Sequence, residues 1–237
     1  VGRMTLRLME PTSGNVYYKD SDIFSLNRKQ LAKLRPQMQI IFQDPYSSLN
    51  PRFTVEQIIG EAISIHYPIN GKALRAKVES LMEKVGLSPM YLNRYPHEFS
   101  GGQKQRIGIA RALGLGPSYM VCDEPVSALD VSIQAQIINL LQKLQQEENL
   151  SMLFISHDLN VVKHLSQRTA VMYLGKIVEL ARTDEINSNS AHPYTQALLA
   201  SKPSLNPKLR NRPPPLSGDV PSPLYPPSGC HFHPRCP

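Results

Sequence analysis

The sequence lacks the features that mark membrane-spanning, secreted and disulfide-stabilised proteins. Its longest uninterrupted apolar run, residues 170–174, is far shorter than the ~20 residues of a membrane-spanning helix. Its first residues contain no apolar segment typical of a secretory signal, so we expect neither a signal peptide nor a transmembrane helix. Three cysteines are too few for a disulfide framework and favour a reducing compartment.

Tryptophan is also absent, and no dense run of Lys and Arg is interleaved with aromatic residues. The chain has 26 Lys and Arg against 19 Asp and Glu, a net charge of +7. Residues 187–237 carry five basic residues and one acidic residue, Asp219, which leaves only +3 for residues 1–186. We therefore interpret the charge as a solvated basic surface and expect no nucleic-acid partner.

Proline is concentrated towards the carboxyl end. Twelve of the 21 prolines lie at Pro193 or beyond, including residues 213–215. Because proline donates no backbone N–H, such a tail cannot build a regular hydrogen-bond ladder. A length of 237 residues corresponds to one large domain or to a domain with an appendage. We therefore divide the chain into a body, residues 1–186, and a Pro-rich extension, residues 187–237.

The body alternates short apolar segments with amphipathic ones, a pattern that predicts an α/β fold with a parallel sheet covered by helices. The expected strands lie at residues 15–18, 38–42, 119–122, 152–155 and 170–173. The expected helices lie at residues 25–34, across 54–92, from the residue after Ser100 to about 113, and at 131–147. In folds of this kind the chemistry is found at the carboxyl ends of the strands.

Polar side chains follow three of the expected strands. Gln43 ends the first, Asp123 and Glu124 end the second, and His157 follows the third. Adjacent residues of a strand point to opposite sides, so the two carboxylates are not expected to share one role. A strand-end carboxylate suits Mg²⁺, and its neighbour is then free to polarise an attacking water. Each residue alone would be an ordinary strand-end cap, but three successive strand ends favour a site.

A second group of residues opens the helix expected after Ser100. Ser100 and Gln103 have the spacing of a capping box. Gly101 and Gly102 allow another surface to approach the backbone, next to the positive end of the helix dipole. Such a start can bind an anion, and the alternative is an ordinary capped helix. Asp123, about twenty residues later, favours the anion site.

Together these segments resemble the ATP-hydrolysing subunit of an ABC transporter. The matches, in chain order, are the Q-loop glutamine Gln43, the signature sequence at 99–103 (which departs from its commonest form at Phe99), Walker B with its glutamate at 119–125, the D-loop at 127–130 and the switch histidine His157. The resemblance implies a P-loop NTPase-like parallel sheet with an inserted helical subdomain, at about residues 54–116, and a Pro-rich carboxyl-terminal extension.

The resemblance also points to a branch of the family. Residues 42–51, 95–99, 130–136 and 192–195 resemble the peptide and nickel importers, and the whole is closest to the second, F-type ATPase of dipeptide and oligopeptide permeases. It implies di- or oligopeptide import, with nickel as the second candidate solute. Two competing functions stay open: a soluble ABC ATPase acting on nucleic acid or ribosomes, and a non-hydrolysing subunit that lends its Ser100 face to a competent partner.

The resemblance assigns a role to each site residue, with ATP and Mg²⁺ as cofactors. Asp123 and Gln43 would hold Mg²⁺, Glu124 would be the general base, and His157 would contact the γ-phosphate. The residues that would bind ATP across a subunit interface are Ser100, Gly101, Gly102, Gln103 and Asp130, the last also coupling the two sites. The implied partners are a second ABC ATPase subunit, two transmembrane permease subunits and an extracytoplasmic solute-binding protein. The implied location is peripheral, at the cytoplasmic face of a bacterial or archaeal membrane.

Two features of the family are missing from the sequence. No Gly-rich P-loop ending in Gly-Lys-Ser/Thr occurs, and residues 4–14 match the stretch that follows it in relatives. We interpret this as an amino-terminal truncation, with the carboxyl end also cut, and expect the isolated chain not to hydrolyse ATP. In relatives, cysteines of the terminal segment can hold an iron–sulfur cluster. Cys230 and Cys236 supply only two thiolates, and Cys122 is expected in the core, so a cluster is expected only in a longer chain.

Overall fold

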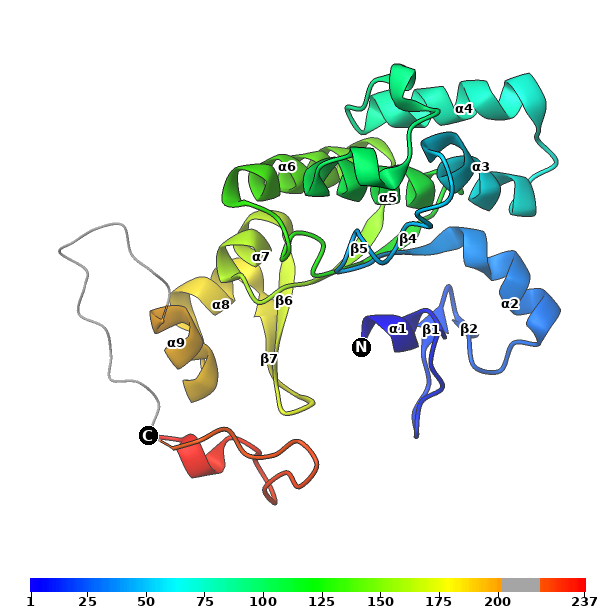
Figure 1. Ribbon diagram of the computed structural model, residues 1–237. Helices are drawn as coiled ribbons and strands as arrows, with labels where there is room; N and C mark the ends of the chain where they lie inside the picture. The colour runs from blue at the N-terminus through cyan, green and yellow to red at the C-terminus, as the bar shows by residue number, and fades with distance from the viewer. Residues whose placement is uncertain (202–217) are drawn as a thin grey trace. The chain divides into compact units, whose positions relative to one another are not determined.

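A computed structural model describes residues 1–201 and 218–237, so the prolines at 213–215 lie outside the described residues. The chain divides into two compact units, residues 1–157 and residues 158–237 (Figure 1). The domain boundary expected from the sequence, between residues 186 and 187, stays a prediction.

The first unit is built on a parallel sheet of three strands in the order β3-β4-β5. The strands are β3 (Met38–Ile41), β4 (Tyr119–Asp123) and β5 (Ser151–Ile155). β4 is central, and its residues 120–122 are fully buried. In the register, Ile41 pairs with Cys122 and Asp123 pairs with Ile155, so the three carboxyl ends lie at one edge. The α/β fold with a parallel sheet is confirmed.

The helices of the first unit cover this sheet and extend beyond it. They are α1 (Gly2–Thr5), α2 (Arg28–Leu34), α3 (Val55–His66), α4 (Gly71–Lys84), α5 (Gly101–Leu113) and α6 (Val131–Glu147). α3, α4 and α5 pack on one another (Figure 1). α2 begins later than the expected residue 25 because Asn27 forms a capping box with Gln30. The strand expected at 15–18 is confined to β1 (Tyr17–Tyr18), which pairs with β2 (Ser21–Asp22) in a short hairpin.

The second unit contains an antiparallel hairpin of β6 (Arg168–Tyr173) and β7 (Lys176–Arg182). Residues 170–173 therefore form a strand as expected, but that strand pairs antiparallel with β7 rather than in the parallel sheet. The two residues between the strands, Leu174 and Gly175, both have positive φ, 42° and 78°. A two-residue type I′ hairpin turn needs positive φ at both central positions, and leucine rarely adopts it. The turn was therefore not predictable from the sequence.

Short helices surround the hairpin in the second unit. They are α7 (Leu159–Leu165), α8 (Thr183–Asn189), α9 (Pro193–Ala200) and the 3₁₀ turn His233–Arg235. Across residues 1–201 and 218–237, no helix has both the length and the apolar character needed to cross a bilayer.

Candidate functional site

The structure brings Gln43, Glu124 and His157 together at the carboxyl ends of β3, β4 and β5. The Gln43 Nε2 donates a hydrogen bond to Glu124 Oε2 at 2.8 Å. His157 Nδ1 lies 3.3 Å from the other carboxylate oxygen, Glu124 Oε1. Each residue comes from a different strand-end loop, so the parallel register is what places the three side chains in contact.

Glu124 holds its position through an uncommon backbone conformation. Its φ is +47°, a left-handed value that costs a non-glycine residue about 1–3 kcal/mol. The backbone N–H of Glu124 donates to the Ile155 carbonyl at 3.0 Å, and its carbonyl accepts from the N–H and Oγ of Ser127 at 3.2 and 3.1 Å. These bonds on both sides fix the turn, which aims the carboxylate at Gln43 and His157.

Asp123 is separate from this hydrogen-bonded group although it precedes Glu124 directly. It is the half-buried last residue of β4 and pairs with Ile155 in the strand ladder. The Glu124 side chain is 27% exposed and that of His157 73%, so water can reach the carboxylate. A reachable carboxylate beside two hydrogen-bonding groups is suited to orienting a water and accepting its proton.

The donor set at this edge fits Mg²⁺ better than it fits a transition metal. Asp123, Glu124 and Gln43 offer hard oxygen ligands, which Mg²⁺ combines with waters and phosphate oxygens. Within the described ranges no three His, Cys, Asp or Glu side chains gather into a metal cage. Cys230 and Cys236 are both exposed, and the described residues give no support for an iron–sulfur cluster. Cys122 is buried in β4, which raises the pKa of its thiol to about 12 and makes it unreactive.

The expected capping box at the start of α5 is confirmed. The Gln103 backbone N–H donates to Ser100 Oγ at 3.4 Å, and the Ser100 N–H donates to Gln103 Oε1 at 3.0 Å. Among the described residues, no hydrogen bond joins Ser100 or Gln103 to the Glu124 group. The structure therefore contains two separate candidate clusters rather than one.

The two glycines of the signature segment (residues 99–103) are required by close packing within this chain. A Cβ at Gly102 would lie 2.4 Å from Ile133 Cγ2, in the first turn of α6. A Cβ at Gly101 would lie 3.2 Å from Leu129 Cδ2 and 3.5 Å from the Tyr46 hydroxyl oxygen. Sequence reasoning expected these glycines to admit another surface, and part of that surface is the chain's own D-loop and α6.

Gly102→Ala is expected to destabilise the first unit by about 1–3 kcal/mol, the usual cost of overpacking. The clashing methyl of Ile133 is attached to a β-branched carbon and cannot swing away without changing χ1. Urea unfolding of the two single variants and of Gly102→Ala/Ile133→Ala measures the effect. The double variant should recover stability relative to Gly102→Ala. Simple additivity of the two single costs would show that the clash does not exist.

Asp130 lies at the exposed start of α6. It occupies the N-cap position, but its side chain makes no capping hydrogen bond. The next residue, Val131, is 82% exposed, which is unusual for an apolar side chain at a helix start. The carboxylate of Asp130 and this valine are thus available to a partner molecule, and its proposed coupling role stays a prediction.

Two contacts that sequence reasoning missed fasten the loop after Gln43 (residues 43–51, the Gln43 loop) to α5. The Lys104 Nζ lies over the Tyr46 ring, 3.9 Å from its centroid. Arg111 Nη1 donates to the Ser48 carbonyl at 2.6 Å. Burial lowers the pKa of Arg111, while nearby Glu61 raises it. The signal in the sequence is a spacing of seven, which puts both cations on one face of the helix.

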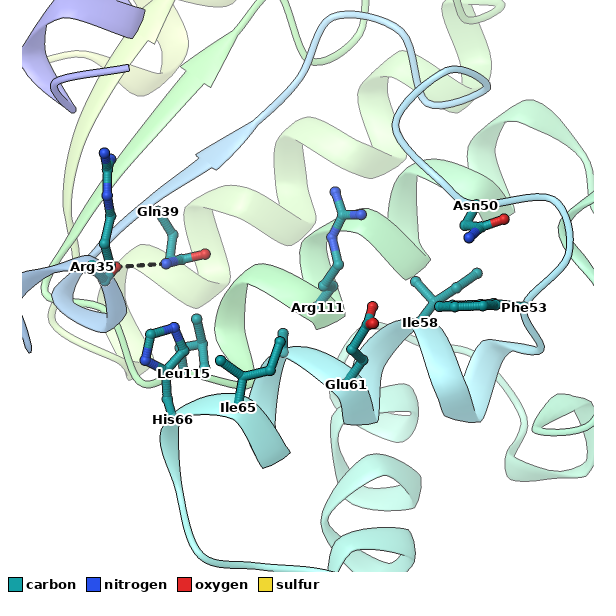
Figure 2. A pocket seen from close by; sticks show the side chains of 11 residues that line it. Arg35, Gln39, Asn50, Phe53, Ile58, Glu61, Ile65, His66, Arg111 and Leu115 are labelled. Carbon is teal, nitrogen blue, oxygen red and sulfur yellow. Dashed lines mark hydrogen bonds between the residues drawn. The ribbon is translucent and has the colours of Figure 1, made fainter. Parts of the chain in front are cut away.

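A groove of about 370 Å³ lies between the Gln43 loop, α3 and α5 (Figure 2). Its apolar part comes from Phe53, Ile58 and Ile65, while Arg111 and Glu61 lie in its middle (Figure 2). Ile65 is 71% exposed at the rim. The groove is thus amphipathic, and its walls are directly connected to Gln43 through the backbone.

Family comparisons agree with this geometry. The model described as "ABC transporter" matches residues 2–127, and the model described as "Oligopeptide/dipeptide transporter, C-terminal region" matches residues 178–237. A protein of Sinorhizobium fredii described as a probable peptide ABC transporter ATP-binding protein is 52% identical over 237 residues, covering 100% of this chain and 67% of that protein. The oligopeptide transport ATP-binding protein AppF of Bacillus subtilis is 53% identical, covering 100% of this chain and 73% of that protein.

Solved structures are similar over most of the chain. The ATP-binding cassette MJ0796, in a dimeric post-hydrolysis state bound to ADP and Pi, has a TM-score of 0.69 at 27% identity, covering 77% of this chain and 78% of that chain. The cbiO1 protein of Clostridium perfringens, part of the ABC transporter complex cbiONQ, has a TM-score of 0.70 at 25% identity, covering 79% of this chain and 73% of that chain.

Proposed function

The chain belongs to the ABC transporter family of ATP-binding subunits, and from that membership we propose that it energises the import of di- and oligopeptides. The contact of Gln43 and His157 with the two oxygens of Glu124 carries the proposal, because it holds a water-accessible carboxylate that can accept a proton at the strand ends. The match of residues 178–237 to the oligopeptide/dipeptide family supports peptides over nickel as the solute.

Each side chain at the strand ends takes one role in the proposed hydrolysis. Glu124 accepts the proton of the attacking water, and the Gln43 amide fixes the orientation of the carboxylate. His157, on the other oxygen, is placed to contact the γ-phosphate. Asp123 and Gln43 hold Mg²⁺, which when bound neutralises charge on the phosphate oxygens.

The signature segment serves the second nucleotide of a two-subunit ATPase. Ser100, Gly101, Gly102 and Gln103 lie apart from the Glu124 group, which is expected if their face completes the site of a partner subunit. The exposed Asp130 then lies at the same interface and couples the two sites. The similarity to a dimeric ATP-binding cassette supports this arrangement.

The remaining proposed partners are two transmembrane permease subunits and an extracytoplasmic solute-binding protein. We assign the groove beside α3 to a segment of a permease subunit, because Gln39 of β3 and Asn50 of the Gln43 loop line it on either side of Gln43, which contacts Glu124. This assembly places the protein at the cytoplasmic face of the membrane as a peripheral subunit.

The polypeptide of these 237 residues is proposed not to turn over ATP alone, because it contains no Gly-Lys-Ser/Thr P-loop. ATPase measurements should give no activity for this polypeptide. Activity should appear in an assembly with permease subunits and a P-loop-containing ATPase subunit, and peptide-loaded binding protein should increase it. Mg²⁺-dependent hydrolysis by the polypeptide alone would contradict this proposal.

The same assembly separates peptide import from the competing functions. Stimulation by DNA, RNA or ribosomes in place of peptide would support the soluble ABC ATPase. If turnover by a chain to which a P-loop-bearing segment has been added did not depend on Glu124, the chain would be a non-hydrolysing partner that lends its Ser100 face.

A further inference from the structure

Lys104 is unusual because it is buried without an anionic partner. Lys104 is only 8% exposed, and lysine is almost never so buried unless it is paired with an anionic group. Across residues 1–201 and 218–237, no carboxylate lies within ion-pair distance of its ammonium group. The partner that the structure provides is the face of the Tyr46 ring, whose centroid is 3.9 Å from Nζ. A cation held this close to an aromatic face in a buried setting is a strong form of the interaction.

Tyr46 in turn contacts the start of α5. The tyrosine is 58% exposed, so burial does not hold it in place. Its hydroxyl oxygen lies 3.5 Å from the position that a Cβ of Gly101 would take. The ring therefore spans one turn of α5, from Gly101 to Lys104, with the lysine ammonium over its face.

The segment between Gln43 and Tyr46 is short and internally braced. Asp44 Oδ1 accepts from the Tyr46 backbone N–H at 2.8 Å, and this bond with one from the Ser47 side chain lowers the pKa of Asp44. Two helical turns along α5, Arg111 holds the Ser48 carbonyl at 2.6 Å. The Gln43 loop is thus fastened to one face of α5 at two points.

We propose that Lys104 and Tyr46 are a positioning pair that couples the two nucleotide sites of the ATPase. The inference rests on the proposed function, in which Gln43 serves one site and Ser100 to Gly102 serve the other. A shift of Gln43 relative to Glu124 passes through the braced segment to Tyr46, and from its ring to the first turn of α5. The Lys104–Tyr46 contact is the part of this path that a single side-chain change can interrupt.

The test assembles the 237-residue chain with permease subunits and a P-loop-containing ABC subunit whose own signature serine has been replaced. Turnover at the partner's P-loop then depends on the Ser100 face of this chain. Lys104→Met and Tyr46→Leu should each lower maximal turnover about tenfold, with the ATP concentration for half-maximal rate unchanged. Lys104→Arg and Tyr46→Phe should restore it, because each keeps the cation or the ring.

The coupling itself is tested by a double-mutant cycle. Gln43→Ala in this chain should lower turnover at the partner's P-loop, and it should have no further effect when Lys104 is already Met. Lys77→Met is the matched control, because Lys77 also lies over a tyrosine ring, 5.3 Å from the centroid of Tyr67, away from the motifs. It should leave turnover unchanged.

Failure of the inference and failure of the proposed function give different results. If Ser100→Glu abolishes turnover while Lys104→Met and Tyr46→Leu leave it intact, the positioning pair is overturned and the function stands. If the unaltered chain produces no turnover, the proposed function fails. Hydrogen exchange of the chain alone then tests whether Lys104 holds the Gln43 loop in place. Lys104→Met should speed exchange of the amides of residues 46–49, and unchanged exchange there would overturn the positioning pair.

Discussion

Glu124→Gln is expected to reduce ATP turnover by about 10²–10⁴-fold, the contribution of a positioned general base. The experiment uses a chimera in which a P-loop-bearing segment from an ABC transporter relative precedes Val1. Glutamine has nearly the same shape as glutamate but cannot accept the proton of the attacking water. Its amide can still contact Gln43 and His157, which now hold Glu124 at 2.8 and 3.3 Å. Nucleotide binding should therefore persist.

Glu147→Gln is the matched control for this substitution. Glu147 is an exposed residue of α6 that pairs with Lys143 at 3.7 Å, an ion pair of a kind that contributes little. Its replacement should change turnover less than twofold. Fluorescent-nucleotide titration measures binding, and phosphate release measures turnover. If the Glu124→Gln variant turned over ATP at the rate of the unaltered chimera, Glu124 would not be the general base.

The strand-end residues were predictable because their positions follow from sheet topology. Apolar runs that end in Gln43, Asp123-Glu124 and His157 predict parallel strands, and parallel strands align their carboxyl ends. The left-handed backbone of Glu124 was not predictable, because nothing in the side chain favours a φ of +47°. That conformation results from the bonds to Ile155 and Ser127, which exist only once β4 and β5 are paired.

The contacts of Tyr46 and the hairpin of the second unit were missed for related reasons. In the sequence, Lys104 has the features of a solvated cation in a basic helix. Its burial is seen only once the Gln43 loop is packed against α5. β7 has exposed residues at most positions and follows Leu174, whose side chain gives no turn signal. Sequence patterns report local periodicity, whereas both features depend on residues distant in the chain.

Phe232→Ala is expected to release the carboxyl-terminal segment, residues 218–237, from the second unit. Phe232 is 1% exposed, and its ring lies among three aromatic side chains. The centroid distances are 5.2 Å to Tyr173, 5.5 Å to Tyr194 and 5.6 Å to His192. Removing a buried phenylalanine costs about 3–5 kcal/mol, most of which should appear as local opening.

The hydrogen bond of His231 to the hairpin contributes less than the contacts of the Phe232 ring. His231 Nδ1 lies 3.0 Å from the Leu174 carbonyl oxygen, and this hydrogen bond joins the segment to the hairpin. Single hydrogen bonds contribute about 1 kcal/mol, less than the loss of the buried ring. Amide exchange at residues 233–236, of which Pro234 has no N–H, should therefore rise about a hundredfold or more in Phe232→Ala.

Leu224→Ala separates anchoring by Phe232 from general sensitivity of the segment. Leu224 lies in the same segment but is 82% exposed, so its truncation removes almost no buried surface. Exchange at residues 233–236 should stay as in the unaltered chain, and Phe232→Leu should fall between the two because it keeps part of the buried volume. Equal exchange in Phe232→Ala and Leu224→Ala would mean that the aromatic cluster does not hold the segment. The graded outcome would instead show that one side chain anchors residues 218–237, the last part of the range that matches the oligopeptide/dipeptide family.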